Sequence, residues 1–268
     1  MAVSTRYRLL ALDLDGTILD ARLQLDPRDL AALERIKQAG VLVIATTGRP
    51  FPGALPWAQR LGLDGPIICY QGAEVRKPDG EVMLDHGIPH DVAMEVIDFA
   101  RERDVHVQAY RDDTLIVERD RPEAHRYSEH AGMPINLVPD LDTAMGPTTP
   151  KLVIVAAPAV IEKLLPVARA RWKGRLNAAT STPDYLEFTN YNSDKSEAVK
   201  FLSERLGVPR EEIAAVGDGR NDASMIAWAG LGVAVEGAYD EVIQAAQHRT
   251  IAPPGHGGIA QLANLLLK

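Results

Sequence analysis

Residues 9–20 read LLALDLDGTILD, an apolar run followed directly by two acidic side chains. The run predicts a central strand that leaves its sheet in a tight turn at Asp13, Asp15, Gly16 and Thr17. In open α/β sheets, ligands bind at this edge. Two carboxylates placed there repel each other and resist desolvation unless a cation or a proton holds them. The motif alone is equally typical of a plain acidic turn, so its meaning depends on what the rest of the chain places beside it.

The composition is that of an ordinary globular protein with a substantial core. The chain has 268 residues, of which 46% are hydrophobic and 25% are charged, enough for one large domain or two modest ones. The formal net charge of -8 and the lack of a basic run disfavour a nucleic-acid partner. The single cysteine, Cys69, excludes an intrachain disulfide and a cysteine-based zinc cluster.

The sequence contains no apolar stretch of membrane-spanning length and no signal-peptide pattern. We therefore expect a cytoplasmic location and no membrane partner. The sequence does not indicate the oligomeric state.

The chain after the two acids alternates helices and strands. Asp26 caps a predicted helix that starts at Pro27, and a buried strand at 41–45 follows. That strand ends in Thr46-Thr47-Gly48-Arg49, which lies at the same sheet edge as the acids if the crossover is right-handed. A threonine hydroxyl and backbone N–H groups suit a phosphoryl oxygen, whereas Arg49 suits either an anion or a structural salt bridge.

The same alternation resumes near the C-terminus. Ser193 or Asp194 caps a predicted helix with Lys195 in its first turn, where a cation opposes the helix dipole unless an anion lies there. A buried strand at 213–216 then ends in GDGRND, residues 217–222, so acids again follow a strand. We predict that residues 1–84 and 190–268 form a Rossmann-like, doubly wound α/β core.

Residues 85–189 have a different pattern, with an amphipathic helix from His90, antiparallel strand pairs and two further helices. We predict that they form an inserted α+β domain, a cap, whose two linkers cross close together.

Four short motifs in this order resemble those of the haloacid dehalogenase superfamily of phosphohydrolases: DLDGT at 13–17, TTGR at 46–49, Lys195 and GDGRND at 217–222. The spacing and the large insert resemble the Cof-type branch with a type IIB (C2B) cap. The resemblance covers nearly the whole chain, and DxDGT together with GDGxND is far more specific than either motif alone.

The resemblance implies a role for each motif residue. Asp13 would be the nucleophile that forms an aspartyl-phosphate, and Asp15 would protonate the leaving group and then activate water. The residues implied to hold the nonbridging phosphate oxygens are Leu14, Thr47, Gly48, Lys195 and Asn221.

The same resemblance implies a Mg²⁺ cofactor on the Asp13 carboxylate, the Asp15 carbonyl and Asp218, with Asp222 just behind these ligands. Independently of the family, a site that offers carboxylates and no thiolate suits a hard cation. Such an ion would offset the repulsion between the nucleophile and the phosphate.

The expected substrate is a small phosphorylated metabolite, such as a sugar phosphate or a phosphorylated cofactor, because a cap would obstruct a folded protein. Two positions depart from the family pattern: Gln71 stands where asparagine is common, and Ser196 stands where glycine is common. The candidate specificity residues are Arg49, Gln71, Tyr110, Asp112, Tyr185, Glu187 and Asn190.

Two other functions remain open at this point. A phosphomutase or phosphotransferase would share the catalytic residues and differ only in the acceptor. A phospho-acceptor or phospholigand-binding switch would also use a strand-end aspartate with a metal, a threonine and a lysine. Asp15 disfavours the switch, because a general acid/base two residues after the nucleophile shortens the life of the phosphoaspartate.

Overall fold

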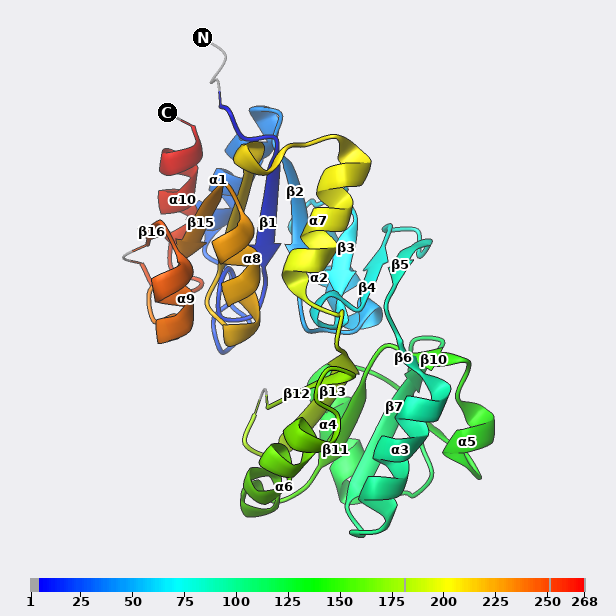
Figure 1. Ribbon diagram of the computed structural model, residues 1–268. Coiled ribbons are helices and arrows are strands. Elements are labelled where there is room, and N and C mark those ends of the chain that lie inside the picture. Colours follow the sequence, from blue (N-terminus) through cyan, green and yellow to red (C-terminus); the bar gives the residue numbers. More distant parts are fainter. Residues whose placement is uncertain (1–4, 181, 251, 268) are drawn as a thin grey trace. The chain divides into compact units, whose positions relative to one another are not determined.

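The computed structural model describes residues 5–180, 182–250 and 252–267, and their contacts divide the chain into two compact units (Figure 1). The core unit comprises Met1–Gly48, Ala54–Met83 and Asp194–Lys268. The inserted unit comprises Arg49–Gly53 and Leu84–Ser193.

One largely parallel sheet organises the core unit. In sheet order, the strands found in the described residues are β16 (His248–Arg249), β15 (Leu231–Ala234), β14 (Ile213–Gly217), β1 (Leu9–Asp13), β2 (Leu42–Thr46), β3 (Ile67–Cys69), β4 (Glu74–Arg76) and β5 (Val82–Asp85). The central strand β1 pairs in parallel with β14 on one side and β2 on the other. All five residues of β1 are buried, as expected for a strand covered on both faces.

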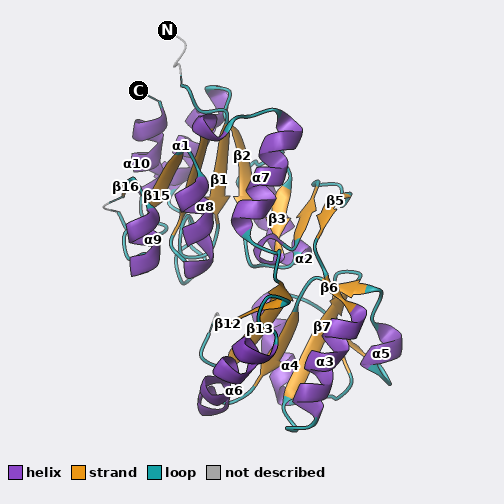
Figure 2. Ribbon diagram, in the orientation of Figure 1, coloured by secondary structure: helices purple, strands orange, loops and turns teal. Residues whose placement is uncertain are grey.

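Helices flank this sheet (Figure 2). They are α1 (Pro27–Gln38), α2 (Phe51–Arg60), α7 (Lys195–Leu206), α8 (Ala223–Trp228), α9 (Asp240–Ala245) and α10 (Gly258–Leu266). Capping residues mark the ends of two of these helices: the Asp26 side chain accepts the Arg28 N–H at the start of α1, and Gly207 ends α7 in the left-handed conformation. Helix α1 packs against α10, and α8 contacts both α7 and α9. This arrangement confirms the predicted Rossmann-like core.

The inserted unit is an α+β layer structure with a mostly antiparallel sheet. Its strands, in sheet order, are β12 (Leu176–Ala179), β13 (Tyr185–Asn190), β11 (Leu152–Val155), β7 (His106–Arg111), β8 (Thr114–Val117) and β9 (Ile135–Leu137), with β6 (Ile88–Pro89) paired to β10 (Thr148–Thr149). Its helices, within the described residues, are α3 (His90–Arg101), α4 (Pro122–Ala131), α5 (Leu141–Ala144) and α6 (Pro158–Arg171). Phe99, Trp172 and Phe188 lie in its hydrophobic core.

The two ends of the inserted segment are tied to each other. Asn190 Nδ2 donates to the Gly87 carbonyl at 2.9 Å, and Ser193 Oγ donates to the His86 carbonyl at 3.0 Å. The two ends of the segment Leu84–Ser193 therefore lie beside each other, while Arg49–Gly53 is a separate segment of the same unit.

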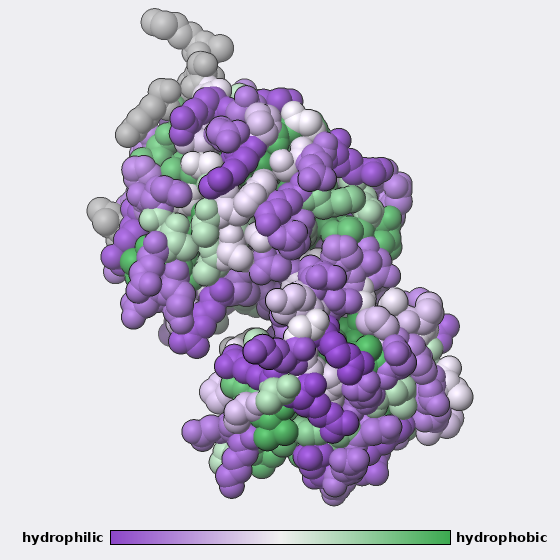
Figure 3. All heavy atoms as spheres, viewed as in Figure 1, coloured by the Kyte–Doolittle hydropathy of each residue, from purple (hydrophilic) through white to green (hydrophobic). Residues whose placement is uncertain are grey.

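Hydrophilic side chains cover most of the face shown in Figure 3. Among the helices of the described chain, none combines the length and the apolar character needed to cross a membrane.

Candidate active site

The turn after β1 brings the first two acids to the edge of the core sheet. Asp13 ends β1 and is 4% exposed, whereas the Asp15 side chain is exposed. The Leu14 carbonyl accepts the N–H of Leu19 at 2.9 Å, and Gly16 has a φ of +80°. A Cβ atom on Gly16 would lie 2.4 Å from Asp218 Oδ2, so only glycine lets the turn approach that carboxylate.

Lys195 joins three segments that are distant in the sequence. Its Nζ atom lies 2.7 Å from Asp13 Oδ1 and 2.6 Å from Asp222 Oδ1, and it also donates to the Thr46 carbonyl at 3.2 Å. The Lys195 side chain is fully buried, since its exposed fraction is 0%. Although burial disfavours the charged form, Asp13 and Asp222 raise the pKa of Lys195 above its ordinary value. The lysine therefore remains a cation inside the acid cluster.

The GDGRND turn after β14 supplies the other two acids. Asp222 Oδ2 accepts the backbone N–H groups of Asp218 at 3.1 Å and Gly219 at 2.9 Å, which fixes the turn. Thr17 Oγ1 donates to Asp218 Oδ1 at 3.1 Å and so links the first motif to the last. The structure thus brings Asp13, Asp218 and Asp222 together, with one carboxylate oxygen of each within 4.8 Å of the others.

This cluster carries more negative charge than Lys195 can balance. Burial, together with Asp222 and Asp218, raises the pKa of Asp13 well above its usual range, although Lys195 opposes the shift. Burial and then the charge of Asp222 raise the pKa of Asp218 to about 6. Within the described chain, the buried Asp13 Oδ2 has no hydrogen-bond partner. Another positive group would relieve both the repulsion and the unpaired oxygen.

A divalent metal ion fits this donor set. Asp13 and Asp218 offer carboxylate oxygens, and Lys195 bonds to Asp13 Oδ1, whereas Asp13 Oδ2 has no hydrogen-bond partner in the described chain. Hard cations such as Mg²⁺ prefer oxygen ligands of this kind. The sequence-based prediction that these acids share one site is compatible with the geometry, and the identity of the ion stays a prediction.

Gln71 bonds to both the 46–49 turn and the 217–222 turn. Thr47 is buried, its N–H donates to the Ile68 carbonyl at 2.8 Å, and its carbonyl accepts the Gln71 N–H at 3.1 Å. Asn221 Nδ2 donates to Gln71 Oε1 at 2.6 Å. Gly48 lies against the same glutamine amide. Residues implied to hold phosphate therefore converge here.

The remaining specificity candidates belong to the inserted unit. Tyr110 hydroxyl is 2.5 Å from the hydroxyl of Tyr127, whose ring centroid is 5.1 Å from that of Tyr185. Glu187 Oε1 accepts from the buried Lys151 at 2.7 Å. Tyr110, Tyr185 and Glu187 thus make contacts within the protein. Substrate contacts stay predictions for all six candidates of this unit, which are Arg49, Tyr110, Asp112, Tyr185, Glu187 and Asn190.

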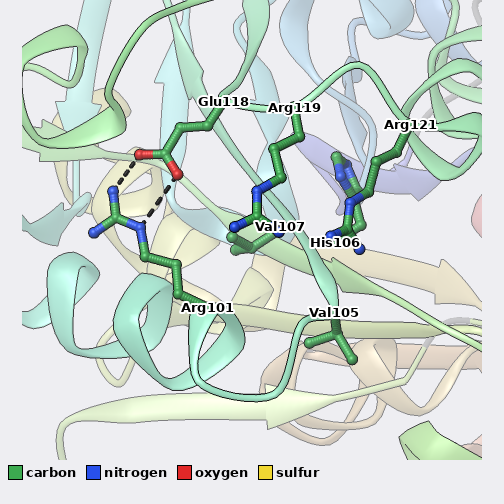
Figure 4. A pocket seen from close by; sticks show the side chains of 7 residues that line it. All are labelled: Arg101, Val105, His106, Val107, Glu118, Arg119 and Arg121. Carbon is green, nitrogen blue, oxygen red and sulfur yellow. Dashed lines mark hydrogen bonds and ion pairs between the residues drawn. The ribbon is translucent and has the colours of Figure 1, made fainter.

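Two hollows lie in the inserted unit. Figure 4 shows the side chains that line one of them, including the pair of Arg101 with Glu118. Its volume is about 20 Å³, and two other lining residues, Arg119 and Arg121, both pair with Asp104. It has room for about one water molecule. The other has a volume of about 410 Å³, and its lining residues are Arg111, Asp112, Thr114, Ile116, Asn136, Val138 and Ala144.

Sequence reasoning predicted Ser193 or Asp194 as the cap of α7, and Asp194 is the cap, since its side chain accepts the Ser196 N–H. Sequence reasoning missed two other contacts. Thr17, which it assigned to the turn alone, also holds Asp218, and Ser224 Oγ donates to the Asp194 carboxylate at 2.7 Å. These contacts join segments far apart in the sequence, so they leave no trace in local spacing.

Comparison with known proteins agrees with this geometry. A family model described as haloacid dehalogenase-like hydrolase matches residues 10–262. The 5-amino-6-(5-phospho-D-ribitylamino)uracil phosphatase YitU of Bacillus subtilis is 29% identical, with 97% of each chain covered. The pyridoxal phosphate phosphatase YbhA of Escherichia coli is also 29% identical, with 95% of this chain and 96% of that protein covered.

A solved structure shows the same fold over the whole length. The crystal structure of TM0651 from Thermotoga maritima superposes with a TM-score of 0.88 and 31% sequence identity, and 98% of each chain is covered. The match therefore includes both units.

Proposed function

Since this chain belongs to the haloacid dehalogenase-like hydrolases, we propose that it is a Cof-type member that hydrolyses phosphate monoesters of small metabolites through an aspartyl-phosphate on Asp13. The enzyme class is that of a phosphoric monoester hydrolase. One observation carries the mechanism: the buried Asp13 keeps one oxygen on Lys195 and the other without a partner in the described chain. A strand-end carboxylate that a lysine fixes in place, and whose remaining charge a bound metal ion can offset, suits a nucleophile that must approach an anionic phosphate.

Asp15 is the proposed general acid and base. It lies two residues beyond Asp13, and its side chain is exposed while that of Asp13 is buried. This difference supports two distinct roles for the two carboxyl groups. Asp15 would donate a proton to the leaving alkoxide oxygen and then accept one from the water that attacks the phosphoaspartate.

A cation and hydrogen-bond donors around the site would stabilise the negative charge of the transferred phosphoryl group. Lys195 supplies a point charge, and Thr47, Gly48 and Asn221 supply hydroxyl, backbone and amide hydrogens, with Leu14 at the same turn as the nucleophile. Mg²⁺, held by Asp13, the Asp15 carbonyl and Asp218 with Asp222 behind them, would supply further positive charge when bound. Positioning and electrostatics of this kind account for most catalysis of phosphoryl transfer.

The substrate class is inferred from relatives of different specificity. YitU and YbhA are named for two different small phosphorylated compounds. We therefore assign this chain a small phosphorylated metabolite, with the residues of the inserted unit as the proposed source of selectivity.

The test is release of phosphate from a panel of phosphate monoesters, with Mg²⁺ and with a chelator. We expect hydrolysis that needs Mg²⁺ and that falls at least about 10³-fold in Asp13→Asn, because the nucleophile is removed. The matched control is Asp64→Asn, an exposed acid of the core unit, which should retain wild-type rates.

Other outcomes would reject a single residue role or change the reaction type. Full turnover in Asp13→Asn would reject the nucleophile, and full turnover in Asp15→Asn would reject the acid/base role. Transfer to an added alcohol in preference to water would identify a phosphotransferase. A stable phosphorylated protein without turnover would favour the switch.

A further inference from the structure

Gln71 lies in a backbone conformation that a glutamine adopts only at a cost. Its φ of 62° and ψ of 25° fall in the left-handed region, and Tyr70 before it has a φ of 50°. Such a conformation is unfavourable for residues other than glycine, and strain of this kind concentrates at functional sites. The turn is also pressed against the start of α7, because a Cβ atom on Gly72 would lie 2.3 Å from the Asp194 carbonyl oxygen.

The turn delivers the Gln71 amide between two segments of the site. The Gln71 backbone N–H is fixed by the Thr47 carbonyl, and its side-chain Oε1 accepts from Asn221 Nδ2 at 2.6 Å. Its Nε2 lies 2.4 Å from the position that a Cβ atom on Gly48 would take. A single side chain thus contacts both the 46–49 turn and the 217–222 turn.

The hydrogen bond between the Asn221 and Gln71 side-chain amides fixes which end of the Asn221 amide faces Gln71. An asparagine side chain has an oxygen that only accepts and an NH₂ group with two hydrogens to donate. Only the NH₂ group suits a phosphate oxygen, whereas the carbonyl oxygen would repel it. Since Gln71 Oε1 is an acceptor, it binds one hydrogen of Asn221 Nδ2 and leaves the other for a ligand.

We propose that Gln71 is a positioning residue, which holds Asn221 with its NH₂ group toward the phosphoryl-binding position. This role rests on the phosphatase function proposed above and differs from direct contact of Gln71 with the substrate. It also gives a reason for the strain, because the left-handed turn is what places Oε1 beside Asn221.

A double-mutant cycle tests the coupling. Gln71→Met keeps the side-chain length but removes the acceptor, and Asn221→Ala removes the group to be oriented. With 4-nitrophenyl phosphate and Mg²⁺, we expect Gln71→Met to lower kcat/KM about tenfold in the wild-type background, the size of one hydrogen bond. In the Asn221→Ala background it should lower kcat/KM less than about twofold, since nothing is left to orient. Gln38→Met, at an exposed glutamine of α1, is the control and should match wild type.

A binding measurement on the same proteins needs no turnover. Calorimetric titration with inorganic phosphate in the presence of Mg²⁺ should show the same coupling in the dissociation constant. If phosphate binding is coupled but no ester is hydrolysed, the phosphatase function fails and the positioning role stands. If esters are hydrolysed and the two substitutions act multiplicatively in both assays, the positioning role is overturned and the phosphatase function stands.

Gln71→Gly separates orientation from stability. Glycine accepts the left-handed conformation freely, so this variant should unfold no earlier than wild type while its kcat/KM falls as in Gln71→Met. A wild-type kcat/KM in Gln71→Gly would overturn the proposal.

Discussion

At the scale of single residues, the site depends on one close approach of backbone to side chain. Gly16 turns the chain with a positive φ, and its α-carbon hydrogen faces the Asp218 carboxylate at a distance that no Cβ atom tolerates. The DxDG signature therefore needs its glycine for two reasons, conformation and space.

This feature predicts the effect of Gly16→Ala. A left-handed alanine costs about 1–2 kcal/mol of stability, and the added methyl group should also displace Asp218. We expect phosphatase activity to fall at least about 100-fold, a size that a misplacement near 1 Å produces, with a higher Mg²⁺ concentration needed for half-maximal rate. Gly80→Ala is the matched control, since Gly80 has a φ of +94° with no atom within 4 Å of the added Cβ. Equal activity in the two variants would contradict the role of the close approach.

At this same scale, sequence reasoning identified the ends of the strands correctly but not the bonds between them. Asp13, Asp218 and Lys195 were recognisable because each follows a buried strand or begins a helix. The bond of Thr17 to Asp218 spans 201 positions and the bond of Asn221 to Gln71 spans 150, so neither leaves a local pattern.

At the scale of elements, the long strands and helices of the core were predictable because their apolar periodicity and caps agree. The short elements of the inserted unit, such as β9 and α5, were not predicted, since three or four residues carry no period. Helix α8 begins at Ala223, after a 3₁₀ turn at Arg220–Asp222, because the Asp222 side chain turns back to the N–H groups of Asp218 and Gly219.

An ion pair between strand β13 and the residue just before β11 should make the stability of the protein depend on pH. Lys151 and Glu187 form an ion pair at 2.7 Å, with side chains that are 4% and 9% exposed. Burial is the largest single influence and lowers the pKa of Lys151, but the charges of Glu187 and Tyr127 and the hydrogen bonds to both together outweigh it, so the pKa lies above its ordinary value. Because the folded pKa exceeds the unfolded one, the stabilisation is complete below the unfolded pKa of about 10.4 and is lost as the pH rises through the folded pKa.

We predict that Lys151→Met lowers the free energy of unfolding at pH 7 by about 3–5 kcal/mol, because the buried Glu187 carboxylate loses the Lys151 cation. The difference from wild type should shrink as the pH rises above about 10.4. Urea unfolding followed by circular dichroism measures both effects. Lys77→Met, in the exposed pair of Lys77 with Glu81, should cost less than about 1 kcal/mol. A comparable loss in the two variants would show that burial of the pair does not matter.

At the scale of the whole molecule, the inserted unit has a core of its own. Its buried hydrophobic cluster runs from Ile88 to Phe188 and surrounds Trp172, whose ring packs edge-on against Phe99 and Phe188. A cluster that draws on one unit alone is what an independently folding domain requires.

We therefore expect a polypeptide of residues 84–193 to fold by itself. It should unfold cooperatively in urea and show a near-ultraviolet circular dichroism signal from the fixed Trp172 ring. The same polypeptide with Phe188→Ala, which removes a ring from that packing, should be less stable by about 3–5 kcal/mol. Retained helix content without a near-ultraviolet signal would instead indicate a molten globule, and the independence of the unit would be rejected.

The tie between the two ends of the inserted segment matters while the protein is being made. Asp13 precedes Lys195 by 182 positions, so a growing polypeptide contains this acid long before the lysine that pairs with it. Once the inserted segment folds, Asn190 bonds to Gly87 and Ser193 bonds to His86. The number of unconstrained residues between the first and last motifs is then much smaller. Closing a short loop costs less conformational entropy than closing a long one. The inserted segment thereby leaves only a shorter loop to close when Asp13 and Lys195 come together.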